Sequence, residues 1–237
     1  MCTVTWEKKN LGYRLLFNRD ELSTREKALP PRVVEKSDIQ TIMPIDSRAG
    51  GTWISANSAG ISICLINNYG AEKRIHSDTA PSRGDLVSSM AFATTQNQAA
   101  ETLLDLKPQR FNPFDIFIFD AHGAPFRWRW DGVDLTTDTP NENFAFSTGF
   151  DIDAVASNRR NLYRQWQEQN RDLADYHRSH IPQASSYSVC MHREDARTQS
   201  MSEIYVEEKL VEFTYWPGPP CQTTALPAVK IHRQQHE

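Results

Sequence analysis

The stretch MCTVTWEKKNLGYRLLFNRDEL (residues 1–22) contains two strand patterns and ends in a cluster of polar residues. The runs TVTW and YRLLFN are rich in β-branched and aromatic residues, and the polar EKKNLG between them predicts a hairpin turn. At the end of the second run stand Asn18, Arg19, Asp20 and Glu21. Such side chains can project into a cleft, where an arginine offers a fixed fork of donors and a carboxylate orients a partner. A turn held by salt bridges is the alternative.

Cys2 stands directly before the first of these strands. A small residue after an initiator methionine generally permits removal of that methionine, which would give Cys2 a free α-amine. One residue would then carry both a thiol nucleophile and an amine whose pKa of about 8 lets it act as the base. The alternative is that Cys2 merely begins a strand.

Beyond this hairpin the sequence alternates groups of strands with helices. We expect a loop over 18–38, two strands from GTWISA and GISICLINN, and helical segments over 82–106 and 151–181. The arginines of 151–181 are interspersed with Asp and Glu, which predicts a solvated helix face. FDIFIFDA, PFRWRWDG, SSYSVCMHR and SEIYVEEKLVEFTYW predict further strands. Clustered antiparallel strands interrupted by helices predict one α+β layered domain over 1–237.

Composition and charge exclude several classes of protein. The chain has 26 Lys and Arg against 30 Asp and Glu, a net charge of −4, so no global charge favours binding to nucleic acid. No apolar run approaches the roughly 20 residues of a transmembrane helix, and MCTVTWEKKN lacks the pattern of a signal peptide. No GxGxxG, P-loop or GxSxG motif is present. We therefore expect a cytoplasmic protein whose partner is a small molecule.

The other three cysteines predict no special chemistry. Cys64 in ISICLI and Cys190 in YSVCM have the pattern of buried strand residues, and Cys221 lies in the proline-rich WPGPPC without an assigned role. No Cys-x-x-Cys pair is present, and no histidine pair stands at zinc-ligand spacing. We therefore expect reduced thiols, no metal site and no cofactor.

Three further motifs carry groups that can contribute to a site. Asn67 and Asn68 close the strand ISICLIN, where an amide can donate to a developing oxyanion, although paired asparagines also simply make turns. The run GGTW at 50–53 indicates a close backbone approach before a strand. Arg197 lies in a late segment, ARTQS, and can bind a carboxylate or orient a nucleophile.

Taken in order, these motifs resemble the NRDE family, the transport and Golgi organisation family. The matching segments are MCTVTW at 1–6, NRDE at 18–21, GGTW at 50–53, NNYG at 67–70, SRGDLV at 82–87 and ARTQS at 196–200. This family is similar in turn to N-terminal nucleophile hydrolases of the bile-salt hydrolase and penicillin V acylase type. The resemblance implies a four-layer αββα sandwich, with two antiparallel sheets between helix layers.

The resemblance also implies roles for particular residues. In such hydrolases an N-terminal cysteine attacks an amide carbonyl, its own amine is the base, an Arg and an Asp hold both groups, and an Asn stabilises the oxyanion. The matching catalytic positions are Cys2, Arg19, Asp20, Asn68 with Asn67 as its alternative, and Arg197. The residues expected to contact substrate are Asn18, Glu21, Asn67 and Trp53.

Two positions depart from that pattern. The Arg and Asp are three residues apart in the amide hydrolases but adjacent in this chain. A second asparagine expected in mid-chain falls near FSTG at 146–149, where a Ser or Thr hydroxyl replaces it only in part.

Two functions follow from the resemblance. The first is an N-terminal-cysteine amidohydrolase that cleaves a non-peptide C–N bond in a small amide or N-acyl substrate. The second is a non-enzymatic binding or trafficking protein for an acyl, lipid or haem ligand, related to Golgi organisation proteins.

Overall fold

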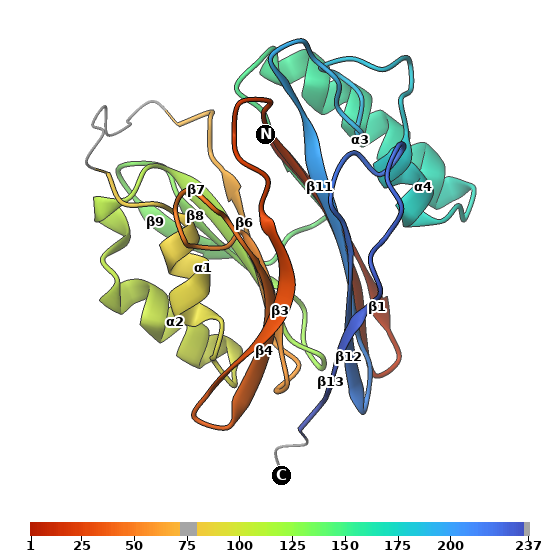
Figure 1. The fold of residues 1–237 in the computed structure, drawn as a ribbon. Coiled ribbons are helices and arrows are strands. Elements are labelled where there is room, and N and C mark those ends of the chain that lie inside the picture. The colour runs from red at the N-terminus through yellow and green to blue at the C-terminus, as the bar shows by residue number, and fades with distance from the viewer. Residues whose placement is uncertain (72–79, 235–237) are drawn as a thin grey trace.

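Two antiparallel β-sheets lie face to face between two layers of helices in the computed structural model, which describes residues 1–71 and 80–234 (Figure 1). The expected α+β sandwich is therefore confirmed. Within the described residues, no helix combines the length and the apolar character that crossing a membrane requires.

The first sheet has the N-terminal hairpin at its centre. Its strand order is β10-β1-β2-β11-β12-β13, and all neighbours are antiparallel. The expected hairpin is confirmed, with longer strands and a turn of only Asn10 and Leu11. The strands of this sheet are β1 (Cys2–Lys9), β2 (Gly12–Leu22), β10 (Phe144–Ser147), β11 (Ala196–Val206), β12 (Leu210–Trp216) and β13 (Val229–His232).

The second sheet follows the order of the chain from β3 to β9. The two strand pairs expected around the turn at 57–60 and around His122 are both present, as β5 with β6 and β7 with β8. The strands are β3 (Leu29–Lys36), β4 (Ile39–Ile45), β5 (Ile54–Asn57), β6 (Ser62–Asn67), β7 (Phe114–Phe119), β8 (Phe126–Trp130) and β9 (Leu135–Asp138).

Each sheet is covered on its outer face by one pair of helices (Figure 1). On the second sheet lie α1 (Gly84–Met90) and α2 (Gln96–Asp105), followed by a single 3-10 turn at Pro108–Arg110. On the first sheet lie α3 (Ile152–Glu168) and α4 (Leu173–Arg178). Both segments expected to be helical thus contain two helices each.

The central strands of the first sheet are buried on both faces. In β1, Val4 and Trp6 enter the core between the sheets, where Trp6 packs edge-on against Phe119 at a centroid distance of 5.4 Å. Thr3 and Thr5, which alternate with them, point to the helix layer and bond to side chains of α3 and α4. The same alternation in β2 places neighbouring residues in two different environments.

The loop expected over 18–38 is wrong, because residues 29–36 form β3. Pro30 and Pro31 are compatible with a strand here because β3 is the edge of its sheet, and the register shifts between Leu29 and Arg32.

The strand expected from SSYSVCMHR at 185–193 is also wrong. Apart from a single bridge between His192 and Arg197, this segment is irregular. Its backbone bonds partly within its own loop, as in the 3.0 Å contact from the Cys190 N–H to the Ser179 carbonyl, and meets β11 only at its end, where the Thr198 N–H donates to the Met191 carbonyl at 2.9 Å. Cys190 is buried as expected.

Gly51 brings the segment before β5 against the start of α1, as the GGTW motif indicated. A Cβ on Gly51 would lie 2.6 Å from the carbonyl carbon of Gly84, which is closer than packed atoms allow. This contact holds α1 against the second sheet.

Gly51→Ala is therefore expected to lower the free energy of unfolding by about 1–3 kcal/mol, because one backbone segment must move away from the other. Urea unfolding measures the change. Gly123→Ala is the matched control, since its added Cβ would meet the Gln96 side chain at an ordinary 3.7 Å. Equal stability of the two variants would contradict the packing described.

Candidate functional site

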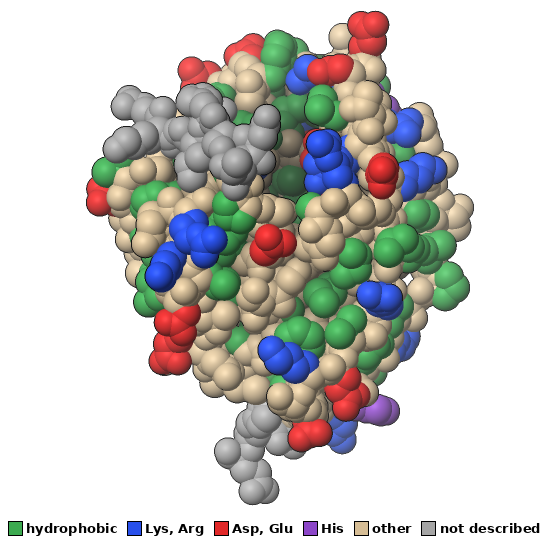
Figure 2. All heavy atoms as spheres, turned by 60° about the vertical axis from the view of Figure 1, so that its left-hand side comes forward, with side chains coloured by type: hydrophobic (Ala, Val, Ile, Leu, Met, Phe, Trp, Pro, Cys, Tyr) green, Lys and Arg blue, Asp and Glu red, His purple; other side chains and the backbone are tan. Residues whose placement is uncertain are grey.

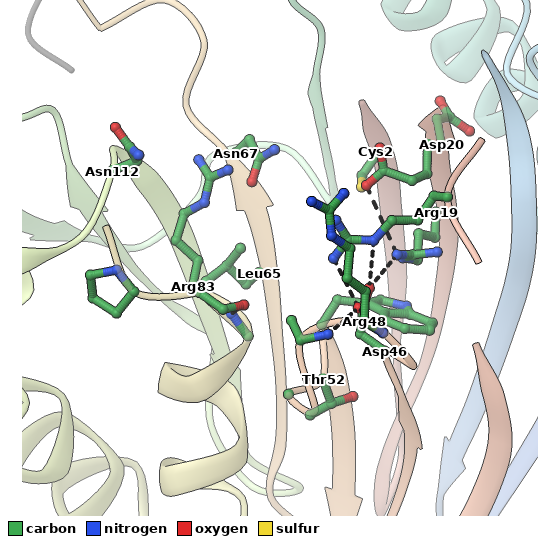
Figure 3. A pocket seen from close by; sticks show the side chains of 18 of the residues that line it. Cys2, Arg19, Asp20, Asp46, Arg48, Thr52, Leu65, Asn67, Arg83 and Asn112 are labelled. Atoms are coloured by element: carbon green, nitrogen blue, oxygen red, sulfur yellow. Dashed lines mark hydrogen bonds and ion pairs between the residues drawn. The ribbon is translucent and has the colours of Figure 1, made fainter. Parts of the chain in front are cut away.

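A pocket of about 570 Å³ opens where the ends of β1 and β2 meet the second sheet. Figure 2 shows a hollow in the surface, with basic and acidic side chains at its rim. In the close view, Cys2, Arg19 and Asp46 lie on one side of this pocket, and Asn67, Arg83 and Asn112 lie on the other (Figure 3). Both sheets and the start of α1 thus contribute to its wall.

Cys2 begins β1 and faces the space between the sheets at the pocket wall. It lies opposite Arg19 of β2 on one side and Ser147 of β10 on the other. Met1 continues this pairing, because its amine donates to the Asp20 carbonyl at 3.0 Å and its carbonyl accepts from the Asp20 N–H at 2.8 Å. Burial raises the pKa of the Cys2 thiol, although the Met1 amine acts in the opposite sense.

Arg19 is held beside Cys2 by a carboxylate and by an aromatic ring. Its Nη2 donates to Asp46 Oδ2 at 2.7 Å, and its guanidinium lies 4.4 Å from the ring centroid of Trp53. Arg25 donates to the other oxygen of Asp46 at 2.8 Å. Burial opposes the charge on Asp46, but Arg25 and the Ala49 N–H outweigh it and lower the pKa of this carboxyl. Asp46 was not singled out in the sequence, where its only signal is an aspartate at a strand end before a turn.

Asp20 points the other way from Arg19, into the helix layer. Its carboxylate lies 3.4 Å from both Nη atoms of Arg159 on α3, and Thr198 donates to its other oxygen at 2.7 Å. Arg159 also donates to the Ser188 carbonyl at 2.8 Å and to Thr3 Oγ1 at 2.6 Å. Both charged side chains have an exposed fraction of 0%. Burial raises the pKa of Asp20, and the charge of Arg159 partly offsets that shift.

The buried position of Arg159 corrects the expectation of a solvated helix face. Arg160 and Arg164 do match that expectation, since Arg160 is partly exposed, Arg164 is exposed, and both bond to Glu142. Arg159 lies on the opposite side of the same helix, and the pattern of charges did not distinguish it.

Of the two candidate asparagines, Asn67 lines the pocket that holds Cys2. Asn68 lies in the wall of a neighbouring pocket, which Asn67 also borders. The Asn67 amide donates to the Tyr69 hydroxyl at 2.8 Å. Ser147, directly across from Cys2, has a buried hydroxyl without a hydrogen-bond partner among the described residues. Asn67 is therefore the candidate asparagine that lines the pocket of Cys2, and Ser147 adjoins Cys2 in the sheet while lining the neighbouring pocket.

Of the remaining residues that the sequence predicted for the site, some line the pocket and others do not. Glu21 lines the pocket, as Trp53 does, and lies 3.9 Å from Arg19. Asn18 does not line it, because its amide is buried and donates to the carbonyls of His177 and Val189. Arg197 is exposed on β11 and lies outside the pocket lining.

One cluster away from this pocket has the residue types of a metal site. The side chains of His180, Cys190, His192 and Cys221 have their ligand atoms within 4.8 Å of one another. The sequence spacing did not indicate this cluster, and the expectation of no metal site stays a prediction.

Comparisons with known proteins agree with this architecture. A model of the family described as transport and Golgi organisation 2 matches residues 1–212. The chain belongs to this family. Membership confirms the resemblance carried by MCTVTW, NRDE and GGTW. A comparison with curated proteins gives no match.

Solved structures similar to this member of the transport and Golgi organisation 2 family are hydrolases. A mutant of conjugated bile acid hydrolase from Clostridium perfringens aligns with a TM-score of 0.57 and 14% identity, over 100% of this chain and 97% of that one. Penicillin V acylase from Agrobacterium tumefaciens aligns with a TM-score of 0.53 and 12% identity, over 90% and 82% of the two chains. This confirms the N-terminal-nucleophile-hydrolase-like sandwich as the fold.

Arg159→Met is expected to lower the free energy of unfolding by about 3–5 kcal/mol at neutral pH, because the Asp20 carboxylate stays buried without its guanidinium. Adding Asp20→Asn should restore part of this loss, since an amide needs no counter-charge. The loss should shrink as the pH falls. The pKa of Asp20 is raised in the folded protein, so acid protonates the folded carboxyl before the unfolded one.

Urea unfolding of these variants at neutral and mildly acidic pH measures both effects. Arg160→Met, on the exposed face of the same helix, is the control and should change stability by about 0.5 kcal/mol or less. Equal losses of unfolding free energy in Arg159→Met and Arg160→Met would show that the buried ion pair does not stabilise the fold more than a surface contact does.

Proposed function

We propose that the protein, once Met1 is removed, is an N-terminal-cysteine amidohydrolase acting on a small N-acyl substrate. The observation that carries this proposal is the position of Cys2 at the end of β1, inside a pocket and directly opposite Arg19. We also propose that residues 1–237 act as one domain, because both sheets line that pocket.

Removal of Met1 would place a primary amine and a thiol on the same residue. The backbone N–H and carbonyl of Asp20, which now bond to Met1, would then be open beside the new amine of Cys2. The buried Asp20 carboxylate lies on the other face of the same strand and adds a negative charge that favours an ammonium. Burial raises the pKa of the Cys2 thiol, and the positive charge of Arg19 acts against that shift and so favours the thiolate.

The reaction would proceed in two balanced steps. In the first, the Cys2 thiol passes its proton to the amine and Sγ bonds to the amide carbon. The C–N bond then breaks, and the leaving amine takes the proton. In the second, water adds to the thioester, the C–S bond breaks, and a carboxylic acid leaves with Cys2 regenerated. The Asn67 amide lines the pocket and is the donor we assign to the oxyanion. The Ser147 hydroxyl, buried next to Cys2 without a partner among the described residues, is a second candidate.

The charges of the pocket favour an anionic substrate. Among the described lining residues, Asp46 is already paired with Arg19 and Arg25. Arg48 and Arg83 add two more positive charges to the wall, and Glu21, 3.9 Å from Arg19, adds a negative one. The Asp20 carboxylate is paired with Arg159 on the other face of β2, so positive charge exceeds negative charge in the pocket. A volume of about 570 Å³ is typical of a small-molecule site. An N-acyl amino acid, which combines an amide with a carboxylate, meets both requirements.

The second candidate function is binding of an anionic acyl ligand in the same pocket without chemistry. It is favoured by the state of the chain that retains Met1. Burial opposes the charged Met1 amine, but negative charge around it, including that of the Asp20 and Glu21 carboxylates, raises its pKa. The thiol of Cys2 also has a raised pKa. Neither group is then in its reactive form.

An N-terminal aldehyde reaction separates the two functions. Protein isolated from its own host is expected to lack Met1 by intact mass and to form a thiazolidine with an added aldehyde, which requires a free amine and thiol on one residue. Cys2→Ala should form no adduct and hydrolyse no substrate. Full retention of Met1 in the isolated protein would contradict the hydrolase and leave the binding function.

The two neighbouring asparagines provide a matched test of the oxyanion donor. Asn67→Ala is expected to lower kcat by about 10²–10³-fold on whichever N-acyl amino acid the wild type hydrolyses, because a donor to the oxyanion is lost. Asn68→Ala should remain close to wild type, since its side chain lies outside the Cys2 pocket. Release of free amino acid measures both rates. Equal losses in the two variants would reject the assignment of Asn67.

A further inference from the structure

We propose that His180, Cys190, His192 and Cys221 bind one zinc ion as a structural site. This site lies outside the pocket of Cys2, and zinc binding does not depend on the proposed hydrolase activity. Cys190 is buried, and the other three side chains are partly exposed.

The four ligand atoms are spaced as the corners of a small tetrahedron. The two Nε2 atoms of His180 and His192 are 3.1 Å apart, and the two Sγ atoms of Cys190 and Cys221 are 3.4 Å apart. His192 Nε2 lies 3.3 Å from Cys221 Sγ and 3.6 Å from Cys190 Sγ. With Zn–S bonds of about 2.3 Å and Zn–N bonds of about 2.0 Å, a tetrahedral site has ligand separations of roughly 3.3–3.8 Å. The other two separations, from His180 to the two cysteines, are no longer than 4.8 Å, so a movement of His180 by up to about 1 Å completes that geometry.

The chemistry of the four ligands favours zinc over other common cations. Two thiolates and two neutral imidazoles balance the charge of a divalent ion, and soft sulfur ligands disfavour Mg²⁺ and Ca²⁺. All four positions are filled by protein side chains, as in structural rather than catalytic zinc sites.

The ion would join two irregular segments. Three ligands lie between the end of α4 and the start of β11, a stretch that contains no helix or strand. Cys221 lies in the connection from β12 to β13. A metal ion would therefore cross-link two connections that are distant in sequence.

The same irregular segment supports the buried Asp20. The Ser188 carbonyl accepts from Arg159 at 2.8 Å, and the Met191 N–H donates to Thr198 Oγ1 at 2.8 Å. Arg159 and Thr198 are the two side chains that bond to Asp20. Zinc would therefore hold the backbone on which the surroundings of Asp20 depend.

Metal analysis of the full chain tests this proposal. Protein stripped with a chelator and reconstituted with Zn²⁺ is expected to hold one ion per chain by elemental mass spectrometry. Co²⁺ in its place should give the strong visible absorption of a tetrahedral site and thiolate-to-cobalt charge transfer. Cys221→Ser and His180→Gln should each weaken Zn²⁺ binding by more than the roughly 10–100-fold that loss of an outer-shell partner costs.

Cys2→Ala is the matched control, because it removes the other partly exposed thiol and should leave the zinc content at one. If the ligand variants do not fold, alkylation of the wild type decides the question. Zinc should protect two thiols until chelator is added, and peptide mapping should identify them as Cys190 and Cys221. The proposal would be overturned if the wild type binds no zinc, or if Cys221→Ser binds zinc as tightly as the wild type. A disulfide between Cys190 and Cys221 after zinc loading would also overturn it.

Discussion

The ion pair between Arg159 and Asp20 is the constraint on which the arrangement around the pocket depends. Both side chains are fully buried, so each charge is stable only while the other remains in place. The pair joins the central strand β2 to α3, and further bonds extend it to Thr198 of β11 and to the Ser188 carbonyl. A helix, two strands and an irregular segment must therefore assemble together before the buried charges are compensated.

Local patterns predicted those parts of the fold that local chemistry determines. The hairpin of residues 1–22, the pairs β5–β6 and β7–β8, and the helical segments follow from alternation, turn residues and period. β3 was missed because prolines normally interrupt strands, and only its position at a sheet edge makes them acceptable. Residues 185–193 were misread because an apolar alternation occurs equally in a buried irregular segment.

In the site, too, residues that are close in sequence could be predicted to lie together, and residues that are distant in sequence could not. Cys2, Arg19 and Asp20 were found because they lie at the ends of two paired strands. Their partners Asp46 and Arg159 come from other parts of the chain, so the sequence offered no sign of either bond. The cluster of His180, Cys190, His192 and Cys221 was likewise hidden, since its members lie in separate loops and follow no known ligand spacing.

Arg19 and Asp20 are consecutive residues that serve two separate layers of the molecule. A strand alternates its side chains, so the insertion or loss of one residue before them would exchange their surroundings. The guanidinium would then face Arg159, and the carboxylate would face Asp46. A one-residue insertion or deletion within β2 before Arg19 would thus break the contacts with Asp46 and with Arg159 together, whereas the contacts lining the pocket can be exchanged without disturbing the opposite face of β2.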